Sequence, residues 1–346
     1  MKKLPVLALP VLCAVILLAV DKSKIPPLPV AVTGNAVAWL RSGTEVYSLM
    51  GIGAKKTWND VTSKVYVLRL KSAKWSEEKP VPGVAGRLGA SAVGVKSQVF
   101  VFGGYTVDGA GNEYILGDVN SYFPDQHRWY RATDIPVPVE GAVIGETRDR
   151  FIYLIGGLSK NGPVNLVQVY DAQKNTWSTA TPFPGAPVFG HAGGIAEEII
   201  VFVDGAMRDP SGGRGYVASD ECWMGKIDRK DINKIVWSKL PSHPGSARFG
   251  IVGGAKDWDH RVYFSGGSPT PHNYKGLDAQ GKPVELSPVA FALELRNSQW
   301  ETIGEEEGNA RADTRGLAIS AIGPLIVGGT ASDAGVTAQV LAVSKK

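Results

Sequence analysis

The sequence predicts an all-β protein folded as a six-bladed β-propeller, and two observations support this prediction. A short apolar run ending in a glycine turn occurs six times along the chain. The runs recur at intervals of about fifty to sixty residues, and a period of this size indicates a repeat architecture. Each interval also has the composition of four short strands separated by turns, which is one propeller blade. The six runs are residues 46–51, 99–104, 152–157, 200–205, 262–267 and 325–329.

Each repeat follows the same order of residue types. A strand of small residues precedes the apolar run, a variable loop and an alternating third strand follow it, and a tryptophan opens the fourth strand. Glycine permits the positive φ or close backbone approach that the turns need. A large flat side chain fills the wedge between neighbouring blades. The tryptophans expected to do this are Trp75, Trp129, Trp177, Trp237 and Trp300.

The last repeat lacks its tryptophan strand, and the N-terminus offers a replacement. Residues 25–30 have the sequence of the end of a fourth strand and its proline-rich loop. We expect this segment to lie beside residues 336–343, because closing the last blade removes an exposed sheet edge. One propeller domain is therefore expected over 21–346. Its blades lie near 31–81, 84–138, 139–184, 187–244, 247–308 and 311–343, with insertions at 207–219 and 268–286.

The ends and the charge of the chain limit its location and partners. Lys2 and Lys3 precede an apolar stretch over 4–20, which is the pattern of a secretory signal. We expect residues 1–20 to be a signal peptide or an N-terminal anchor, and the protein to be periplasmic or secreted. Without that segment Cys222 is the only cysteine, so no internal disulfide can form. The net charge of +4 comes without any run of basic residues, which argues against a nucleic-acid partner. No group of residues has metal-ligand spacing. We expect no cofactor, no metal, no membrane span beyond the N-terminal segment, and a monomer.

Polar residues gather where a propeller would place its channel mouth. The loops that enter the small-residue strands share a face with the loops that follow the glycine turns. Arginines at matched positions of one ring would repel one another without an anion, so they predict a carboxylate ligand, with hydroxyls bonded by Asn, His and Tyr. The same residues could instead fill and hydrogen-bond the channel. The strand entrances supply Asn35, Arg87, Glu140, His191, Arg248 and Arg315, and the loops supply Lys56, Tyr105, Arg214, Asn273 and Tyr274.

Two of these residues are candidates for catalysis. His191 stands between glycines, and imidazole titrates near neutral pH, which suits a general acid or base. Glu140 is the only other acid–base group at an equivalent entrance. We therefore expect His191 and Glu140 to share the proton transfers of any reaction at the mouth.

The glycine, tyrosine and tryptophan pattern over residues 35–343 resembles the kelch repeat family. Within it, the N-terminus and the six units are similar to the bacterial N-acetylneuraminate epimerase (sialate mutarotase) group. That resemblance implies a periplasmic protein that speeds the interconversion of sugar anomers. The group has a glutamate directly after the glycine turn of a central blade, where this chain has Ala206, and an arginine that Arg214 would match.

Two functions are therefore open. One is an exported enzyme or binder of a small acidic sugar or similar polar ligand, with mutarotase-like chemistry at the mouth. The other is a non-catalytic kelch module that holds a protein or glycan on its loop face. A pocket-sized polar cavity at the mouth favours the first function, and a flat face favours the second.

Overall fold

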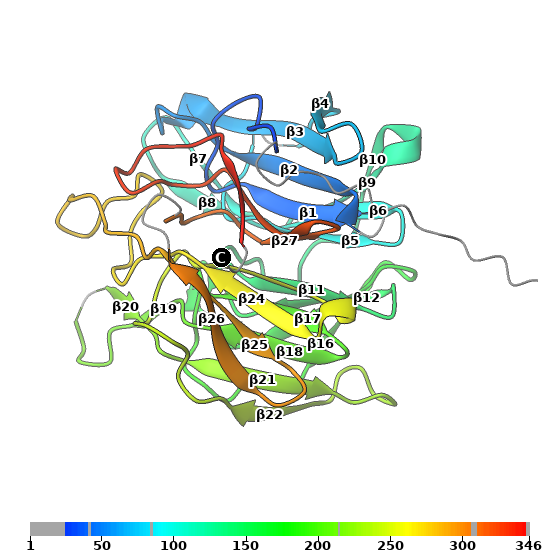
Figure 1. The fold of residues 1–346 in the computed structure, drawn as a ribbon, viewed down its shortest axis with the longest axis vertical. Helices are drawn as coiled ribbons and strands as arrows, with labels where there is room; N and C mark the ends of the chain where they lie inside the picture. The colour runs from blue at the N-terminus through cyan, green and yellow to red at the C-terminus, as the bar shows by residue number, and fades with distance from the viewer. Residues whose placement is uncertain (1–24, 41–42, 84–85, 214, 306–309, 344–346) are drawn as a thin grey trace, which may run out of the picture.

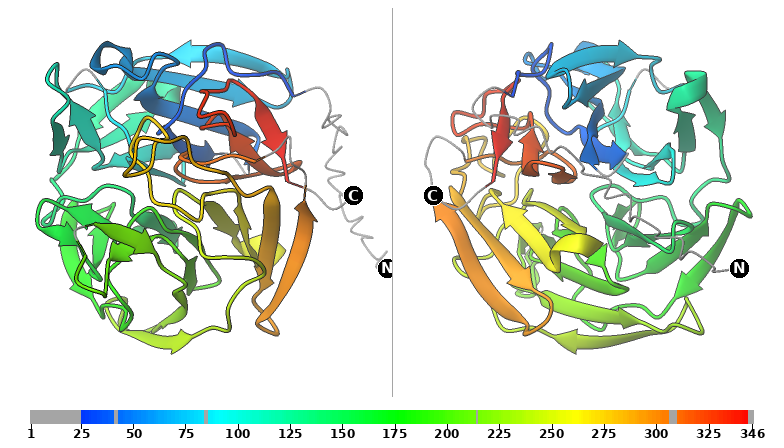
Figure 2. Two further views of the ribbon diagram at one scale, coloured as in Figure 1. Left: turned by 90° about the vertical axis from the view of Figure 1, so that its left-hand side faces the viewer. Right: turned by 45° about the vertical axis from the view of Figure 1, so that its right-hand side comes forward.

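A computed structural model describes residues 25–40, 43–83, 86–213, 215–305 and 310–343. Six antiparallel sheets stand around a central channel as the blades of a propeller (Figures 1 and 2). The described residues contain no α-helix and three short 3-10 helices, η3 (Trp58–Asp60), η4 (Pro124–Gln126) and η5 (Asp257–Asp259). The predicted all-β six-bladed propeller is confirmed.

The blades follow one another in chain order, and each sheet runs from the channel outward. Blade 1 contains β1 (Ala36–Leu40), β2 (Glu45–Ile52), β3 (Val61–Arg69) and β4 (Lys74–Glu78); blade 2 contains β5 (Ser91–Val95), β6 (Gln98–Phe102), β9 (Val119–Phe123) and β10 (Arg128–Arg131); blade 3 contains β11 (Val143–Thr147), β12 (Phe151–Ile155), β15 (Val167–Asp171) and β16 (Thr176–Ala180).

The second half of the molecule repeats this order, with one strand fewer in the last sheet. Blade 4 contains β17 (Ala192–Ala196), β18 (Ile199–Val203), β21 (Cys222–Ile227) and β22 (Ile235–Lys239); blade 5 contains β23 (Val252–Lys256), β24 (Arg261–Ser265), β25 (Val289–Glu294) and β26 (Gln299–Glu305); blade 6 contains β27 (Ala318–Ser320), β28 (Gly323–Val327) and β29 (Val340–Ala342).

Three small hairpins stand on the loops after the glycine turns of blades 2, 3 and 4. They are β7 (Tyr105–Val107) with β8 (Glu113–Ile115), β13 (Leu158–Ser159) with β14 (Gly162–Pro163), and β19 (Ala206–Arg208) with β20 (Tyr216–Ala218).

Small residues form the inner strands because the strands crowd one another at the axis. A Cβ built on Gly94 of β5 would lie 2.1 Å from the carbonyl oxygen of Trp39 in β1 of the neighbouring blade. Real Cβ atoms do not come so close, so only glycine fits there. The hydrophobic core lies farther out, as one cluster of buried side chains at each of the six junctions between blades.

The tryptophans pack at these junctions, and each also makes the same polar contact. The indole N–H of each one donates to a backbone carbonyl in the outer loop of the blade before it. The bonds are Trp129 to Lys79 (2.8 Å), Trp177 to Thr133 (3.0 Å), Trp237 to Thr181 (3.0 Å), Trp300 to Pro241 (2.9 Å) and Trp75 to Pro26 (2.9 Å).

The last of these bonds shows how the ring closes. Pro26 occupies the place that the loop after the fourth strand has in the other blades. Next to it, the Leu28 N–H donates to the Ala338 carbonyl over 2.7 Å. Leu28 is buried in the core cluster between blades 6 and 1. The predicted closure by residues 25–30 is confirmed, whereas the predicted signal or anchor over 1–20 lies outside the described residues. Among the described residues, no helix is long and apolar enough to cross a membrane.

Candidate functional site at the mouth of the channel

A closed ring of backbone hydrogen bonds encircles the channel at its mouth. Each blade contributes one residue, and its N–H donates to the carbonyl of the corresponding residue in the blade before it, over 2.9–3.1 Å. All six residues are in the left-handed region, with φ between 61° and 66°. We call this set the mouth ring, and its members are Gly34, Gly89, Gly141, Gly190, Gly250 and Asp313.

Glycine is needed in the mouth ring for two reasons. The left-handed conformation disfavours residues with a Cβ, although Asp and Asn tolerate it. The space is also taken: a Cβ on Gly89 would lie 2.6 Å from Oε2 of Glu140, and a Cβ on Gly250 would lie 2.6 Å from Oδ1 of Asp313. Asp313 is thus the one member that projects a side chain at this level.

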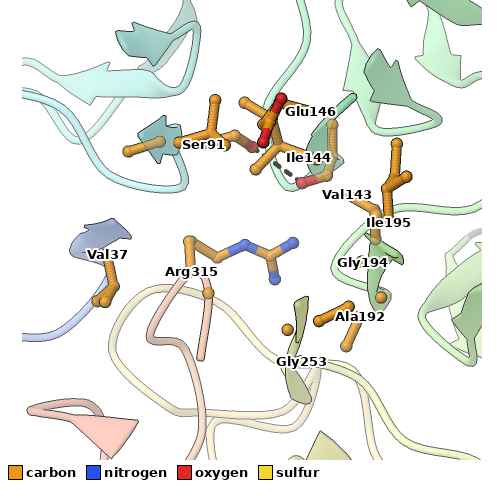
Figure 3. A pocket seen from close by; sticks show the side chains of 18 of the residues that line it. Val37, Ser91, Val143, Ile144, Glu146, Ala192, Gly194, Ile195, Gly253 and Arg315 are labelled. Carbon is orange, nitrogen blue, oxygen red and sulfur yellow. Dashed lines mark hydrogen bonds between the residues drawn. The ribbon is translucent and has the colours of Figure 1, made fainter. Parts of the chain in front are cut away.

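The mouth ring separates two cavities. Above it, a mouth pocket of about 380 Å³ is bordered by the strand entrances and by the loops after the glycine turns. Below it, a narrow channel of about 210 Å³ is lined largely by glycine and small apolar residues. Arg315 borders both. Figure 3 shows it extending into the channel, where its Nη2 donates to the His191 carbonyl over 3.1 Å.

Two carboxylates face each other across the mouth. Oε2 of Glu140 lies over Gly89 of blade 2, and Oδ1 of Asp313 lies over Gly250 of blade 5. In the order of the mouth ring these two glycines are opposite members. Aromatic side chains border the pocket between them, namely Tyr105, Phe189, Tyr216, Phe249 and Tyr274.

The two carboxyl groups have unlike environments. Burial raises the pKa of Glu140 to about 7, and the nearby Arg315 only partly offsets this. Burial alone would raise the pKa of Asp313 as well. The charges of His272 and Lys56 and the hydrogen bonds from His272 and Thr330 have the larger combined effect, and they lower the pKa of that carboxyl. Near pH 7 Glu140 is therefore present in both its protonated and its ionised form, while Asp313 is ionised.

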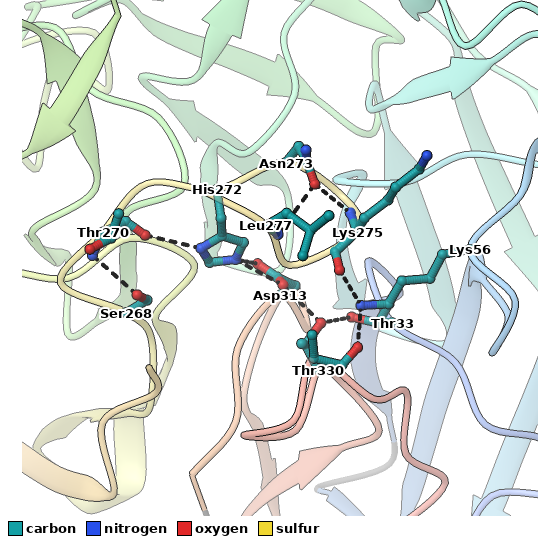
Figure 4. Close-up of polar contacts among 11 residues, drawn as sticks. Thr33, Lys56, Ser268, Thr270, His272, Asn273, Lys275, Leu277, Asp313 and Thr330 are labelled. Carbon is teal, nitrogen blue, oxygen red and sulfur yellow. Dashed lines mark hydrogen bonds and ion pairs between the residues drawn. The ribbon is translucent and has the colours of Figure 1, made fainter. Parts of the chain in front are cut away.

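The insertion at 268–286 forms a strap over one side of the mouth pocket (Figure 4). Nε2 of His272 lies 3.0 and 3.1 Å from the two carboxylate oxygens of Asp313, and Nδ1 lies 3.1 Å from the Thr270 carbonyl. Because both ring nitrogens face acceptors, His272 is an imidazolium paired with Asp313. Farther along, Nζ of Lys56 donates to the carbonyls of Lys275 and Ala334, over 2.8 and 2.6 Å. The strap thus joins blade 5 to blades 6 and 1.

The predicted convergence of three arginines in one pocket is wrong. Arg87 and Arg248 each stand two residues before the mouth ring and are 1% exposed. Nη1 of Arg87 donates to the carbonyls of Gly103 and Asp118, and Arg248 makes the equivalent bonds within blade 5. Each guanidinium holds the glycine turn of its own blade against the third strand. Arg315 stands two residues after the ring, so it alone of the three reaches the axis.

His191 was also predicted to act at the mouth, but its side chain does not lie where it could contact a ligand there. His191 directly follows the mouth ring, is 1% exposed, and packs against Phe202 beneath the mouth. Burial, with a smaller effect from Arg315, lowers its pKa to about 3, so it is neutral near pH 7. Asn35 has the same position in blade 1, and its amide donates to Ser48 Oγ and the Val327 carbonyl. Both side chains lie inside the wall of the propeller.

The other predicted residues divide between the strap and the pocket. Tyr105 and Tyr274 border the pocket, and burial raises the pKa of Tyr105 well above its usual value. Asn273 also borders it, and its Oδ1 accepts the Lys275 N–H of the strap. Lys56 binds carbonyls instead of facing the pocket, and Arg214 lies outside the described residues.

The mouth is not the cationic ring that the sequence predicted. Among the described residues that border the pocket, Arg315 is the one arginine or lysine, and four carboxylates accompany it: Glu113, Glu140, Asp278 and Asp313. The prediction missed Asp313. The signal was present, because Asp313 stands where the other five entrances have glycine.

Comparison with known families agrees with this architecture. Residues 36–267, more than half of the chain, match the family model described as the KLHDC2/KLHL20/DRC7 Kelch-repeats domain. The chain belongs to the kelch-repeat family. A solved structure, that of YjhT, superposes with a TM-score of 0.74 over 92% of this chain and 96% of the other, at 18% identity, which supports the fold.

Relatives of this chain include N-acetylneuraminate epimerases and Kelch-like proteins. The N-acetylneuraminate epimerase of Salmonella enteritidis is 23% identical over 68% of this chain, and the match spans 65% of that protein's length. The protein of the same name from Pasteurella multocida is 25% identical, with 83% of each chain covered. Human Kelch-like protein 34 is 26% identical over 55% of this chain but only 29% of its own.

Proposed function

We propose that the mouth pocket binds a small sugar and speeds the interconversion of its anomers, with Glu140 and Asp313 exchanging protons with the ligand. The observation that supports this most directly is the placement of the two carboxyl groups on opposite sides of the mouth, over the mouth ring. Carboxyl pairs in unlike environments are a recurring arrangement for acid–base catalysis.

The chemistry needs two proton transfers in each direction. Opening a sugar ring removes the proton of the anomeric hydroxyl and adds one to the ring oxygen. The fraction of Glu140 that is protonated near pH 7 can donate, and ionised Asp313 can accept. Closure on the other face of the carbonyl reverses both transfers, so no proton is consumed. Tyr105 keeps its phenolic proton at this pH and can donate a hydrogen bond.

Size and lining suit a sugar. A pocket of about 380 Å³ is within the range of small-ligand sites. Aromatic faces pack against the apolar face of a sugar, and carboxylates accept bonds from its hydroxyls. The names of the bacterial relatives favour an acidic sugar, N-acetylneuraminate, which Arg315 would bind. The excess of carboxylates favours a neutral one. The assay therefore includes both.

The test is anomer exchange of freshly dissolved N-acetylneuraminate and galactose, followed by NMR. We expect the wild-type protein to speed equilibration of at least one sugar. Glu140→Gln should reduce this by about 10²-fold or more, the usual effect of a general acid or base. Glu77→Gln, the same change at an exposed site on β4, is the matched control and should have no effect. Failure of the wild-type protein to speed either sugar would contradict the proposal.

The second candidate is an interaction module, and the match to human Kelch-like protein 34 favours it. In that case a protein or glycan would lie on the loop face without being changed. The pocket-sized cavity at the mouth favours the small ligand instead.

We also propose that the protein acts outside the cytoplasm, since residues 1–20 have the pattern of a secretory signal. Cell fractionation tests the location, and mass spectrometry of the mature protein shows whether residues 1–20 have been removed.

A further inference from the structure

A second group of chemically capable residues lies in blade 4, away from the mouth. Asp204 follows β18, Cys222 begins β21, and His243 is in the loop after β22. None of the three borders the mouth pocket or the channel. They meet because β18 and β21 are paired at Val203 and Cys222, and because the Leu240 N–H donates to the Cys222 carbonyl.

The three side chains form a buried cluster of donor atoms. Asp204 is 0% exposed, Cys222 is 1% and His243 is 7%. One ligand atom from each, an oxygen, a sulfur and a nitrogen, lies within 4.8 Å of the other two. These are the atoms that zinc and similar ions bind in proteins.

The hydrogen bonds show that the cluster needs a positive species at its centre. Nδ1 of His243 lies 2.9 Å from the Pro244 carbonyl, so this nitrogen carries a proton and donates it. The lone pair of Nε2 then points at Oδ1 of Asp204, 2.7 Å away. Two lone pairs cannot face each other at that distance without a proton or a cation between them. The second oxygen, Oδ2 of Asp204, is buried and has no hydrogen-bond partner among the described residues.

We propose that Asp204, Cys222 and His243 form a structural binding site for a divalent ion of the zinc class. The fourth donor would be the unpartnered Oδ2 of Asp204, through a bidentate carboxylate. The Pro244 carbonyl fixes the tautomer and direction of His243, as outer-shell partners of metal-bound histidines commonly do.

The cluster can bind a divalent ion without a change in its net charge, because two protons leave when the ion enters. Binding Zn²⁺ expels the proton held between His243 and Asp204 and the proton of the Cys222 thiol. Two positive charges enter and two leave, so the net charge of the cluster is unchanged. This matters because the guanidinium of Arg248 is buried nearby and would oppose any added positive charge.

The site would join two blades. The ring of His243 stacks on Phe291 of blade 5, with ring centroids 4.4 Å apart and planes 10° from parallel. An ion bound to His243 would therefore fix the junction between blades 4 and 5, and we expect it to stabilise the fold without entering the reaction at the mouth.

The experiment measures metal binding by the full chain. Protein stripped with a chelator is dialysed against Zn²⁺, and metal content and thermal midpoint are measured. We expect one ion per chain and a higher midpoint. His243→Gln and Cys222→Ser should weaken binding by more than about 100-fold, a larger loss than outer-shell changes cause. His272→Gln, the matched histidine change outside the cluster, should leave Zn²⁺ binding intact.

A spectroscopic measurement covers the case in which these variants do not fold. Co²⁺ added to the stripped wild-type protein should give the near-ultraviolet charge-transfer absorption of a thiolate ligand, and Zn²⁺ should displace it. Absence of tight Zn²⁺ binding and of this absorption would overturn the proposal, and a shared proton would then be the positive species. Unchanged binding by folded His243→Gln and Cys222→Ser would overturn it as well.

Discussion

At the scale of single residues, the offset from the mouth ring decides what each side chain does. Two residues before the ring, Arg87 and Arg248 bind inside their own blades. One residue after it, His191 is buried in the wall. Three side chains reach the mouth pocket or the axis: Glu140, one residue before the ring, Asp313, in the ring, and Arg315, two residues after it. The sequence showed that these residues are near the strand entrances. It could not show the direction of each side chain, since a shift of one residue changes the face to which it points.

The mouth ring gives a prediction at this scale. Gly89→Ala should destabilise the protein by about 1–3 kcal/mol, because Gly89 has a left-handed backbone that disfavours a Cβ. A further loss is expected because the new Cβ would lie 2.6 Å from Oε2 of Glu140. Gly111→Ala is the control, because Gly111 also has a positive φ but has nothing within 4 Å of its Cβ position. Chemical denaturation of both variants measures the difference, and equal losses of stability would show that the mouth is not crowded.

At the scale of elements, the strands were predictable and the strap was not. Glycine turns recur in all six blades and the tryptophans in five of them, so they mark the strands of the sheets. The strap at 268–286 occupies the loop that forms a short hairpin in blades 2, 3 and 4, and its length marks it only as an insertion. Its contacts with Asp313 and Lys56 join residues far apart in sequence. The cluster of Asp204, Cys222 and His243 could not be predicted for the same reason. Pairing of strands brings these residues together, and no short sequence motif contains them.

The strap should respond to pH through its ion pair. Asp313 raises the pKa of His272 above the usual 6.5 despite burial, so the stabilisation from this pair is fully present below 6.5 and is lost as the pH rises through the folded value. At the acid end, the lowered pKa of Asp313 means that stabilisation is lost as the pH falls through that value. The difference in strap stability between the wild-type protein and His272→Gln should therefore be largest between these two pH limits. Hydrogen exchange of the strap amides measures this, and a difference that persists unchanged at alkaline pH would contradict it.

At the scale of the whole molecule, the closed ring explains how a chain with one strand missing remains a propeller. Pro26 accepts the bond from Trp75 that outer loops of the other blades accept from their neighbours, and Leu28 fills the junction of blades 6 and 1. The sequence was sufficient to predict this closure, because the missing strand and its replacement are both visible as pattern.

Removal of the closing segment tests this directly. A chain that begins at residue 31 should melt at a markedly lower temperature than one that begins at residue 21, because it loses the buried Leu28 and the acceptor of the Trp75 indole. Circular dichroism of the two chains on heating provides the comparison. Equal melting temperatures would mean that residues 21–30 do not close the ring.

The central claim is that Glu140 exchanges protons with a sugar at the mouth, and the pH dependence of anomer exchange tests it most directly. Glu140 must be protonated to donate, so the rate should fall as the pH rises through about 7, the pKa to which burial raises this carboxyl. In Glu140→Gln this alkaline limb should disappear along with most of the rate. Between pH 6 and 8 about four-fifths of Glu140 would change its charge. A wild-type rate that is constant over this range would contradict the account, as would an alkaline limb that persists in Glu140→Gln.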